Sequence, residues 1–173
     1  MNRLASLLPG LGLLLALAAA APAAAQPPAR HALYLEAGGR GPYYSLNYER
    51  RLRPGARLQW ALSVGAAVLP DEVALPLGLT ALTHPQGAHH AALGLSVTPA
   101  VQHYRTLGAR EDYSDKLLYL APGLGYRYQR PLGGLLLAVG ATPLWRLDPP
   151  SYDPWDFSVR FYPSGHLAVG WGF

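Results

Sequence analysis

Serine and histidine side chains lie close together in the sequence at two places, and this pairing can support acyl transfer. Ser164 and His166 are two residues apart, so they share a face if the segment is extended. A second group flanks or lies within a polar segment and consists of His103, Glu111, Asp112 and Ser114. A serine becomes nucleophilic when a histidine takes its proton and an acid orients that histidine. Both groups are therefore candidate catalytic sites.

Metal and cofactor chemistry is poorly supported by the sequence. His89 and His90 are adjacent, and neighbouring strand residues point to opposite faces, so the two rings cannot readily bind one metal together. The chain has no cysteine, which excludes disulfides, thiolate metal sites and a lipid anchor on cysteine. No glycine-rich phosphate loop leads from a strand into a helix. We expect no cofactor and no metal.

The composition is unusual for a soluble domain. Charged residues make up 14% of the chain, against about 25% in typical soluble domains. Such a chain has too few polar side chains to cover its outside in water. The formal net charge is +4, and Lys116 is the only lysine. A nucleic-acid binder concentrates positive charge on one face. The arginines here are scattered over expected turns and strand ends, so we expect no nucleic-acid partner.

The first residues resemble a secretory signal peptide. Arg3 supplies a positive charge, an apolar stretch follows, and the small residues Ala23, Ala24 and Ala25 fit a cleavage site. The sequence thus predicts a signal peptide over 1–25 and one domain over 26–173. No later stretch is apolar for the ~20 residues that a spanning helix needs. For a membrane protein without such a helix, the remaining architecture is a closed barrel.

Alternating apolar and small or polar residues predict eight strands. Clusters of Gly, Pro, Asp and Ser separate them. The last strand shows the pattern clearly, because Leu167, Val169, Trp171 and Phe173 alternate with small or polar residues. The expected strands are about 31–38, 42–52, 56–69, 73–83, 89–103, 116–129, 134–147 and 162–173. Four prolines, Pro76, Pro99, Pro122 and Pro143, lie inside or near strand ends and are expected to mark bulges near the rim.

The two faces of these strands differ in a way that lipid requires. One face is broad and apolar, whereas the other carries glycines and charges, which predicts an apolar outside and a polar lumen. Eight strands leave an interior that side chains just fill, so no large pore is expected. The expected lumen network of paired charges consists of Glu36, Glu49, Arg57, Arg127 and Arg146.

Register and aromatic residues give further expectations. Facing residues of strands two and three should have numbers with an even sum, as in a pairing of Glu49 with Arg57, and those of strands six and seven an odd sum. With short turns on the periplasmic side, one aromatic girdle forms near that interface, from Tyr48, Trp60, Tyr126, Tyr128, Trp171 and Phe173. A second, at the opposite interface, would contain Tyr44, Trp145 and Trp155.

Several stretches resemble small eight-stranded outer-membrane barrels of the OmpX and OmpA-transmembrane-domain type. They are 44–51, 121–128, 134–145 and the last strand, which ends on phenylalanine. The resemblance implies an all-β, antiparallel up-and-down transmembrane barrel in the outer membrane of a Gram-negative bacterium. It also implies a monomer that contacts outer-membrane lipid and lipopolysaccharide and meets the barrel-assembly machinery through its C-terminal strand.

The expected function follows from this architecture and stays general. We expect a structural or surface-interaction role and no enzymatic activity. The aromatic residues of the last external loop, Tyr152, Trp155 and Phe157, are candidates for contact with lipopolysaccharide or a partner protein. They equally suit membrane-interface anchors. The alternative is a lipid-A-modifying enzyme of the deacylase or acyltransferase type, which would use the serine and histidine residues above.

Overall fold

The computed structural model describes residues 28–52, 57–104, 113–148 and 158–173. Within these ranges the regular structure is all β, with no helix that could cross a membrane. The strands are β1 (His31–Gly38), β2 (Tyr44–Arg51), β3 (Leu58–Val68), β4 (Glu72–Ala74), β5 (Leu77–Thr83), β6 (His89–Tyr104), β7 (Tyr113–Gln129), β8 (Gly134–Ala141), β9 (Leu144–Asp148), β10 (Ser158–Tyr162) and β11 (Gly165–Gly172).

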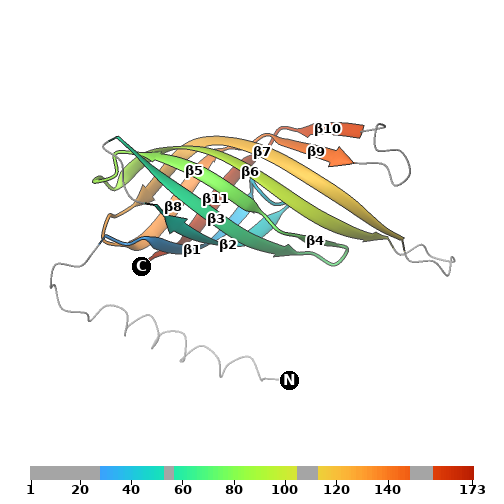
Figure 1. Ribbon diagram of the computed structural model, residues 1–173, viewed down its shortest axis with the longest axis horizontal. Helices are drawn as coiled ribbons and strands as arrows, with labels where there is room; N and C mark the ends of the chain where they lie inside the picture. Colours follow the sequence, from blue (N-terminus) through green and yellow to red (C-terminus); the bar gives the residue numbers. More distant parts are fainter. Residues whose placement is uncertain (1–27, 53–56, 105–112, 149–157) are drawn as a thin grey trace, which may run out of the picture.

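These segments form a closed, antiparallel, up-and-down barrel of eight strands (Figure 1). Each strand pairs with its neighbour in sequence, and the barrel closes where β1 pairs with β11, from Ala32 opposite Gly172 to Gly38 opposite His166. Three of the eight strands are each split into two segments, namely β4 with β5, β8 with β9, and β10 with β11. The expected eight-stranded fold is therefore confirmed.

The four prolines meet at two gaps in the ladder and do not form bulges along the continuous strands. Pro76 separates β4 from β5, and Pro99 lies across that gap, where its carbonyl accepts a hydrogen bond from the Leu75 amide at 2.9 Å. Pro143 separates β8 from β9, and the register on either side of it brings Pro122 opposite. The β6–β7 register runs unbroken through Pro99 and Pro122. Prolines lack an amide donor, so grouping them confines the lost hydrogen bonds to two places.

Along most strands the outward side chains are apolar and the inward ones are polar or small, and Leu82 and Leu136 are large apolar residues that are also buried. Along β3, every odd-numbered residue is buried and every even-numbered residue is exposed. Several outward residues are about half exposed, at 48–52%, namely Leu35, Leu62, Leu95, Val139 and Val169. The expected parity is confirmed, because Glu49 faces Ser63 and Tyr126 faces Val139. A one-residue slip in either pair would reverse the two faces.

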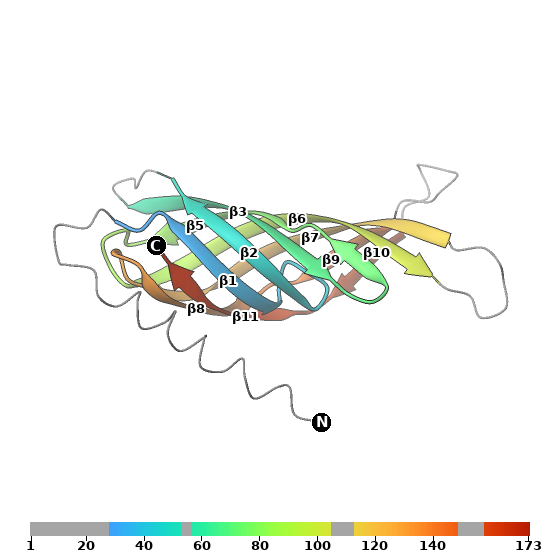
Figure 2. The same cartoon turned by 90° about the horizontal axis from the view of Figure 1, so that it is seen from below.

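The two ends of the barrel differ. At the terminal end, Phe173 and His31 exchange backbone hydrogen bonds at 2.8 and 2.9 Å. At the opposite, distal end, β6 and β7 extend beyond β1 and β2 (Figure 2). There they form an open sheet with β4, β9 and β10. The buried side of this distal sheet holds an apolar cluster of Ala67, Ala74, Ala100, Leu117, Tyr119, Ala121 and Leu144.

Candidate functional site

A buried ion pair crosses the lumen toward the terminal end. Arg127 of β7 donates from both terminal nitrogens to the two carboxylate oxygens of Glu49 of β2, each at 2.8 Å. The Arg127 Nε also donates to Gln129 Oε1 at 3.0 Å. Glu49 is fully buried and Arg127 is 4% exposed. The planar guanidinium matches the carboxylate in this two-pronged geometry, so the pair joins opposite walls of the barrel.

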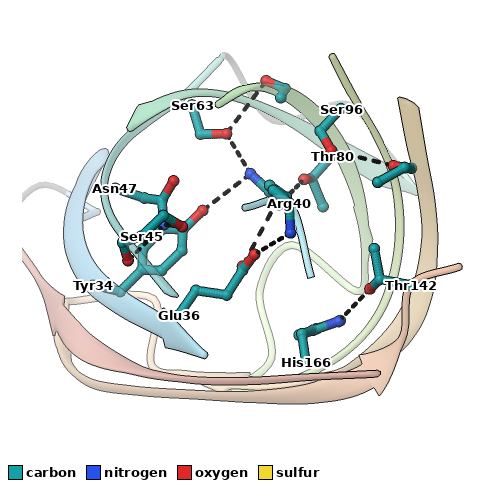
Figure 3. A network of polar contacts seen from close by, with 12 residues as sticks. Tyr34, Glu36, Arg40, Ser45, Asn47, Ser63, Thr80, Ser96, Thr142 and His166 are labelled. Atoms are coloured by element: carbon teal, nitrogen blue, oxygen red, sulfur yellow. Dashed lines mark hydrogen bonds and ion pairs between the residues drawn. The ribbon is translucent and has the colours of Figure 1, made fainter. Parts of the chain in front are cut away.

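A second polar cluster closes the lumen toward the distal end, and its centre is Arg40 (Figure 3). The Arg40 guanidinium donates to the hydroxyls of Ser63, Tyr34 and Thr80, the last two at 3.1 and 3.0 Å. The Arg40 amide donates to Glu36 Oε1 at 2.9 Å. Its carbonyl accepts a hydrogen bond from Thr98 Oγ1 at 2.8 Å. Residues from four strands, β1, β3, β5 and β6, therefore bind one arginine.

Arg40 reaches the lumen because the β1–β2 turn folds into the barrel mouth. Gly38 and Gly39 have φ angles of +70° and +74°, which glycine adopts without steric cost. A Cβ at Gly39 would lie 2.5 Å from Glu36 Oε1, so glycine also allows the turn amide to approach that carboxylate. Across the lumen, a Cβ at Gly78 would lie 2.6 Å from Arg40 Nη1. Glycine at these positions makes room for the partly buried arginine.

Between the two charged clusters lies a cavity of about 50 Å³. It is lined by Tyr34, Glu36, Arg40, Arg127 and His166, together with small residues of β6, β7 and β8. The Nδ1 of His166 is 2.6 Å from Thr142 Oγ1. A water needs roughly 10–15 Å³ of such space and several polar partners. The cavity therefore suits a few waters between two polar plugs, and it is too small for a wide channel.

The five residues of the expected lumen network divide into three groups. Glu36, Glu49 and Arg127 are buried in the lumen, as described above. Arg146 lies opposite Tyr119 in the distal sheet, and its Nη2 is 3.2 Å from Asp148 Oδ2. Arg57 is exposed, so its expected pairing with Glu49 is wrong. The β2–β3 connection is longer than expected, which moves the register by several residues while keeping its parity.

Arg40, the central residue of the distal cluster, was not among the expected site residues. Its position between glycines at 39 and 41 predicts an exposed turn, and strand alternation says nothing about turn residues. The signal that could have found it is charge balance. Glu36 and Glu49 both point into the lumen, and a buried carboxylate needs a cation. Arg127 can pair with only one of these two carboxylates, and it pairs with Glu49.

The aromatic residues expected as a girdle lie on the outside, near the terminal end. Tyr48, Trp60, Tyr126, Trp171 and Phe173 are 40–61% exposed, and Tyr128 is partly buried. Histidines join them. His31 stacks on Tyr48 and Phe173, at ring distances of 5.8 and 5.9 Å, and its Nδ1 is 2.6 Å from the Tyr48 hydroxyl. His89 contacts the rings of Tyr126 and Tyr128. At the distal end, Trp145 packs on Phe161 at 5.3 Å.

The serine and histidine candidates gain no support from the geometry. Ser164 Oγ donates to the Gly165 carbonyl at 3.3 Å, whereas His166 bonds to Thr142 inside the barrel. His103 is exposed and lies opposite Ser114 in the β6–β7 register, whereas Glu111 and Asp112 lie outside the described residues. Of the adjacent pair, His89 points outward and His90 is buried, with its Nδ1 2.6 Å from the Thr83 carbonyl oxygen. Among the described residues, no three His, Asp or Glu side chains gather as a metal site.

The Arg40 cluster gives a prediction on stability. Replacing Arg40 with alanine removes the hydrogen bonds to three hydroxyls and leaves Glu36 buried without its cation. Hydrogen bonds to charged groups contribute about 1.5–3 kcal/mol each but do not add within one network, so we expect the free energy of unfolding to fall by less than their sum, roughly 2–4 kcal/mol. Urea unfolding of the refolded barrel would measure this. The control is Arg50→Ala, because Arg50 is exposed. Equal effects of the two changes would contradict a structural role of Arg40.

Comparisons with known proteins give a likeness of fold. No protein-family model matches the chain. No curated protein sequence matches it either. Among solved structures, the chain is similar to the N-terminal β-barrel domain of Pseudomonas aeruginosa OprF, with 12% sequence identity and a TM-score of 0.49. The match covers 86% of this chain and 98% of that chain. At this identity the likeness concerns the barrel and says nothing of activity.

Proposed function

We propose that this protein is an integral outer-membrane β-barrel with a structural or surface-interaction role and a filled lumen. The observation that carries the proposal is the inverted distribution of polarity over a closed barrel. Leucines and valines cover the outside, whereas Glu49, Asn47, Gln129 and Thr98 are fully buried within. In water, exposed apolar patches of this extent would associate. In lipid, the same surface is the favourable one.

The lumen supports a structural role in preference to passage of solutes. The Glu49–Arg127 pair and the Arg40 cluster block it at two levels, with a small cavity between them. Each plug joins strands from different sides of the barrel. A buried pair contributes specificity of pairing even where its net stability is modest. We infer that the charged lumen residues hold the barrel closed.

The distal end favours the surface-interaction part of the proposal. Strand β10 pairs with β9, and within the part of the chain that the structure describes it has no second neighbour. Every residue of β10 is exposed, including Val159 and Phe161. An edge strand offers unpaired amides and carbonyls to a partner. The segment 149–157, which joins β9 to β10, contains the candidates Tyr152, Trp155 and Phe157 and lies outside the described residues.

Lipopolysaccharide is the lipid partner that we propose for the distal end. Lys116 and Arg160 are exposed there, on β7 and β10. Lys116 lies on the outward face, opposite Val101, whereas Arg160 lies opposite Arg146 on the inward face of the distal sheet. Phosphate groups bind such cations, and lysine and arginine at an interface keep their charge in water while their stems lie on apolar surface. We therefore propose that the distal end faces outward and that the short turns face the periplasm.

Fractionation of cells that produce the full chain would test the membrane assignment. We expect the protein in the outer-membrane fraction, resistant to extraction by high salt. Its folded form should migrate differently from the heated form on a gel in detergent. Recovery of folded protein in a detergent-free soluble fraction would overturn the proposal.

Lipid A from a strain lacking the protein should keep its acyl chains. A change in those chains, restored by the wild type and not by His166→Ala, would instead favour the enzyme.

A further inference from the structure

Arg51 is buried at the terminal end without a partner for most of its guanidinium. It ends β2, points inward, and is 3% exposed. Its Nε and Nη2 atoms are buried and make no hydrogen bond. The nearest lumen carboxylate, Glu49, already receives both terminal nitrogens of Arg127. A buried charge without hydrogen bonds is costly, so a ligand for these two donors would stabilise the fold.

A small pocket lies beside the Arg51 guanidinium. It has a volume of about 30 Å³ and is lined by Pro28, Ala29, Arg30, Arg51, Gln59, Pro85 and Pro131. These residues come from the segment before β1, from β2 and β3, and from two turns. The segment is held in place where the Ala29 amide donates to the Pro131 carbonyl and the Arg51 amide to the Arg30 carbonyl, at 2.8 and 2.6 Å. The pocket is therefore built by several elements.

The charge of this pocket is positive throughout. Its lining contains two arginines and no acidic residue. The three prolines lack amide donors, so the unused donors are those of Arg51. The polar group of Gln59 also faces this region, and its Oε1 is buried without a hydrogen bond. Rotation of that amide would present a further donor, since the two ends of a glutamine amide are nearly interchangeable in shape.

We propose that this pocket binds one small inorganic anion, the size of chloride or bromide. The anion would accept hydrogen bonds from Arg51 Nε and Nη2 and from the Gln59 amide. It would neutralise the Arg51 guanidinium, because Glu49 already pairs with Arg127. A pocket of this volume holds about two waters, which suits a small ion better than a lipid headgroup. The bound anion would fix the segment before β1 against the end of the barrel.

Anion-dependent stability of the refolded full chain tests this proposal. The barrel would be unfolded in uncharged detergent with sodium chloride, sodium bromide or sodium gluconate at equal ionic strength. A ligand at ten times its dissociation constant raises the folded-to-unfolded ratio about tenfold. We expect such a saturable increase with chloride and bromide. Gluconate, which is too large for the pocket, should not give it. Equal effects of all three salts would overturn the proposal.

Variants and a direct view of the anion complete the test. Arg51→Met should abolish the halide dependence, whereas Arg50→Gln should keep it, because Arg50 is exposed. Halide dependence that survives in Arg51→Met would overturn the assignment of the site. If Arg51→Met does not fold, anomalous diffraction from wild-type crystals soaked in bromide would show whether an anion occupies the site. An anomalous peak at hydrogen-bond distance from Arg51 Nε and Nη2 is expected. Water density without an anomalous peak would overturn the proposal.

Discussion

Replacing Glu49 with alanine is expected to lower the free energy of unfolding of the barrel by about 3–5 kcal/mol. Glu49 is fully buried and is bound by both terminal nitrogens of Arg127. Its removal leaves Arg127 and Arg51 as buried cations, and the hydrogen bonds to Gln129 are those that Arg127 keeps. Cations in a low-dielectric lumen repel each other, and neither can reach bulk water without opening the barrel. Urea titration of the refolded protein, followed by tryptophan fluorescence, would measure the loss.

A double variant separates the loss of the pair from the cost of the cation that remains. Replacing Glu49 with alanine and Arg127 with methionine removes both charges and keeps an apolar stem in the lumen. Substitution of a whole buried pair by apolar residues is often neutral or stabilising. We therefore expect the double variant to be clearly more stable than Glu49→Ala alone. If the two single variants and the double variant lose equal stability, the stranded cation is not the cause.

Strand positions and faces were predictable because alternation is a local signal. Each outward leucine and each inward glycine or polar residue belongs to the same two-residue period. That period fixes the parity of every pairing, as Glu49 opposite Ser63 shows. It does not fix how many residues a turn uses, and this is why Arg57 was placed in the lumen wrongly. The length of a connection depends on backbone geometry that the alternation does not contain.

The Arg40 plug was beyond this reasoning for a related reason. Alternation does not predict where the side chain of a turn residue points, because that depends on the direction in which the turn folds. The direction here follows from two positive φ angles, at Gly38 and Gly39, and from polar partners of which Ser63, Thr80 and Thr98 lie far from Arg40 in the sequence. The prolines posed the same difficulty. Each proline lacks the amide donor that a ladder needs, but their pairing across two gaps requires the register of four strands.

Leu95→Arg is expected to lower the free energy of unfolding by about 2–4 kcal/mol. The size of this loss shows whether lipid or water surrounds the barrel. Leu95 lies midway along β6, points outward and is 50% exposed. On the lipid face of a barrel, a cation near the bilayer midplane costs about this much, and the cost falls toward 0–1 kcal/mol near the interfaces. On a water-exposed face, such a surface substitution would change stability by within about 0.5 kcal/mol.

Val159 provides the matched control for Leu95. It is 57% exposed on β10, in the distal sheet that extends beyond the closed part of the barrel. Val159→Arg places the same charge on an apolar outward position outside the proposed hydrocarbon band, and we expect a loss below about 1 kcal/mol. Unfolding of both variants in lipid vesicles would give the comparison. A loss of similar size at the two positions would mean that one solvent surrounds both, and the outer-membrane assignment would then fail.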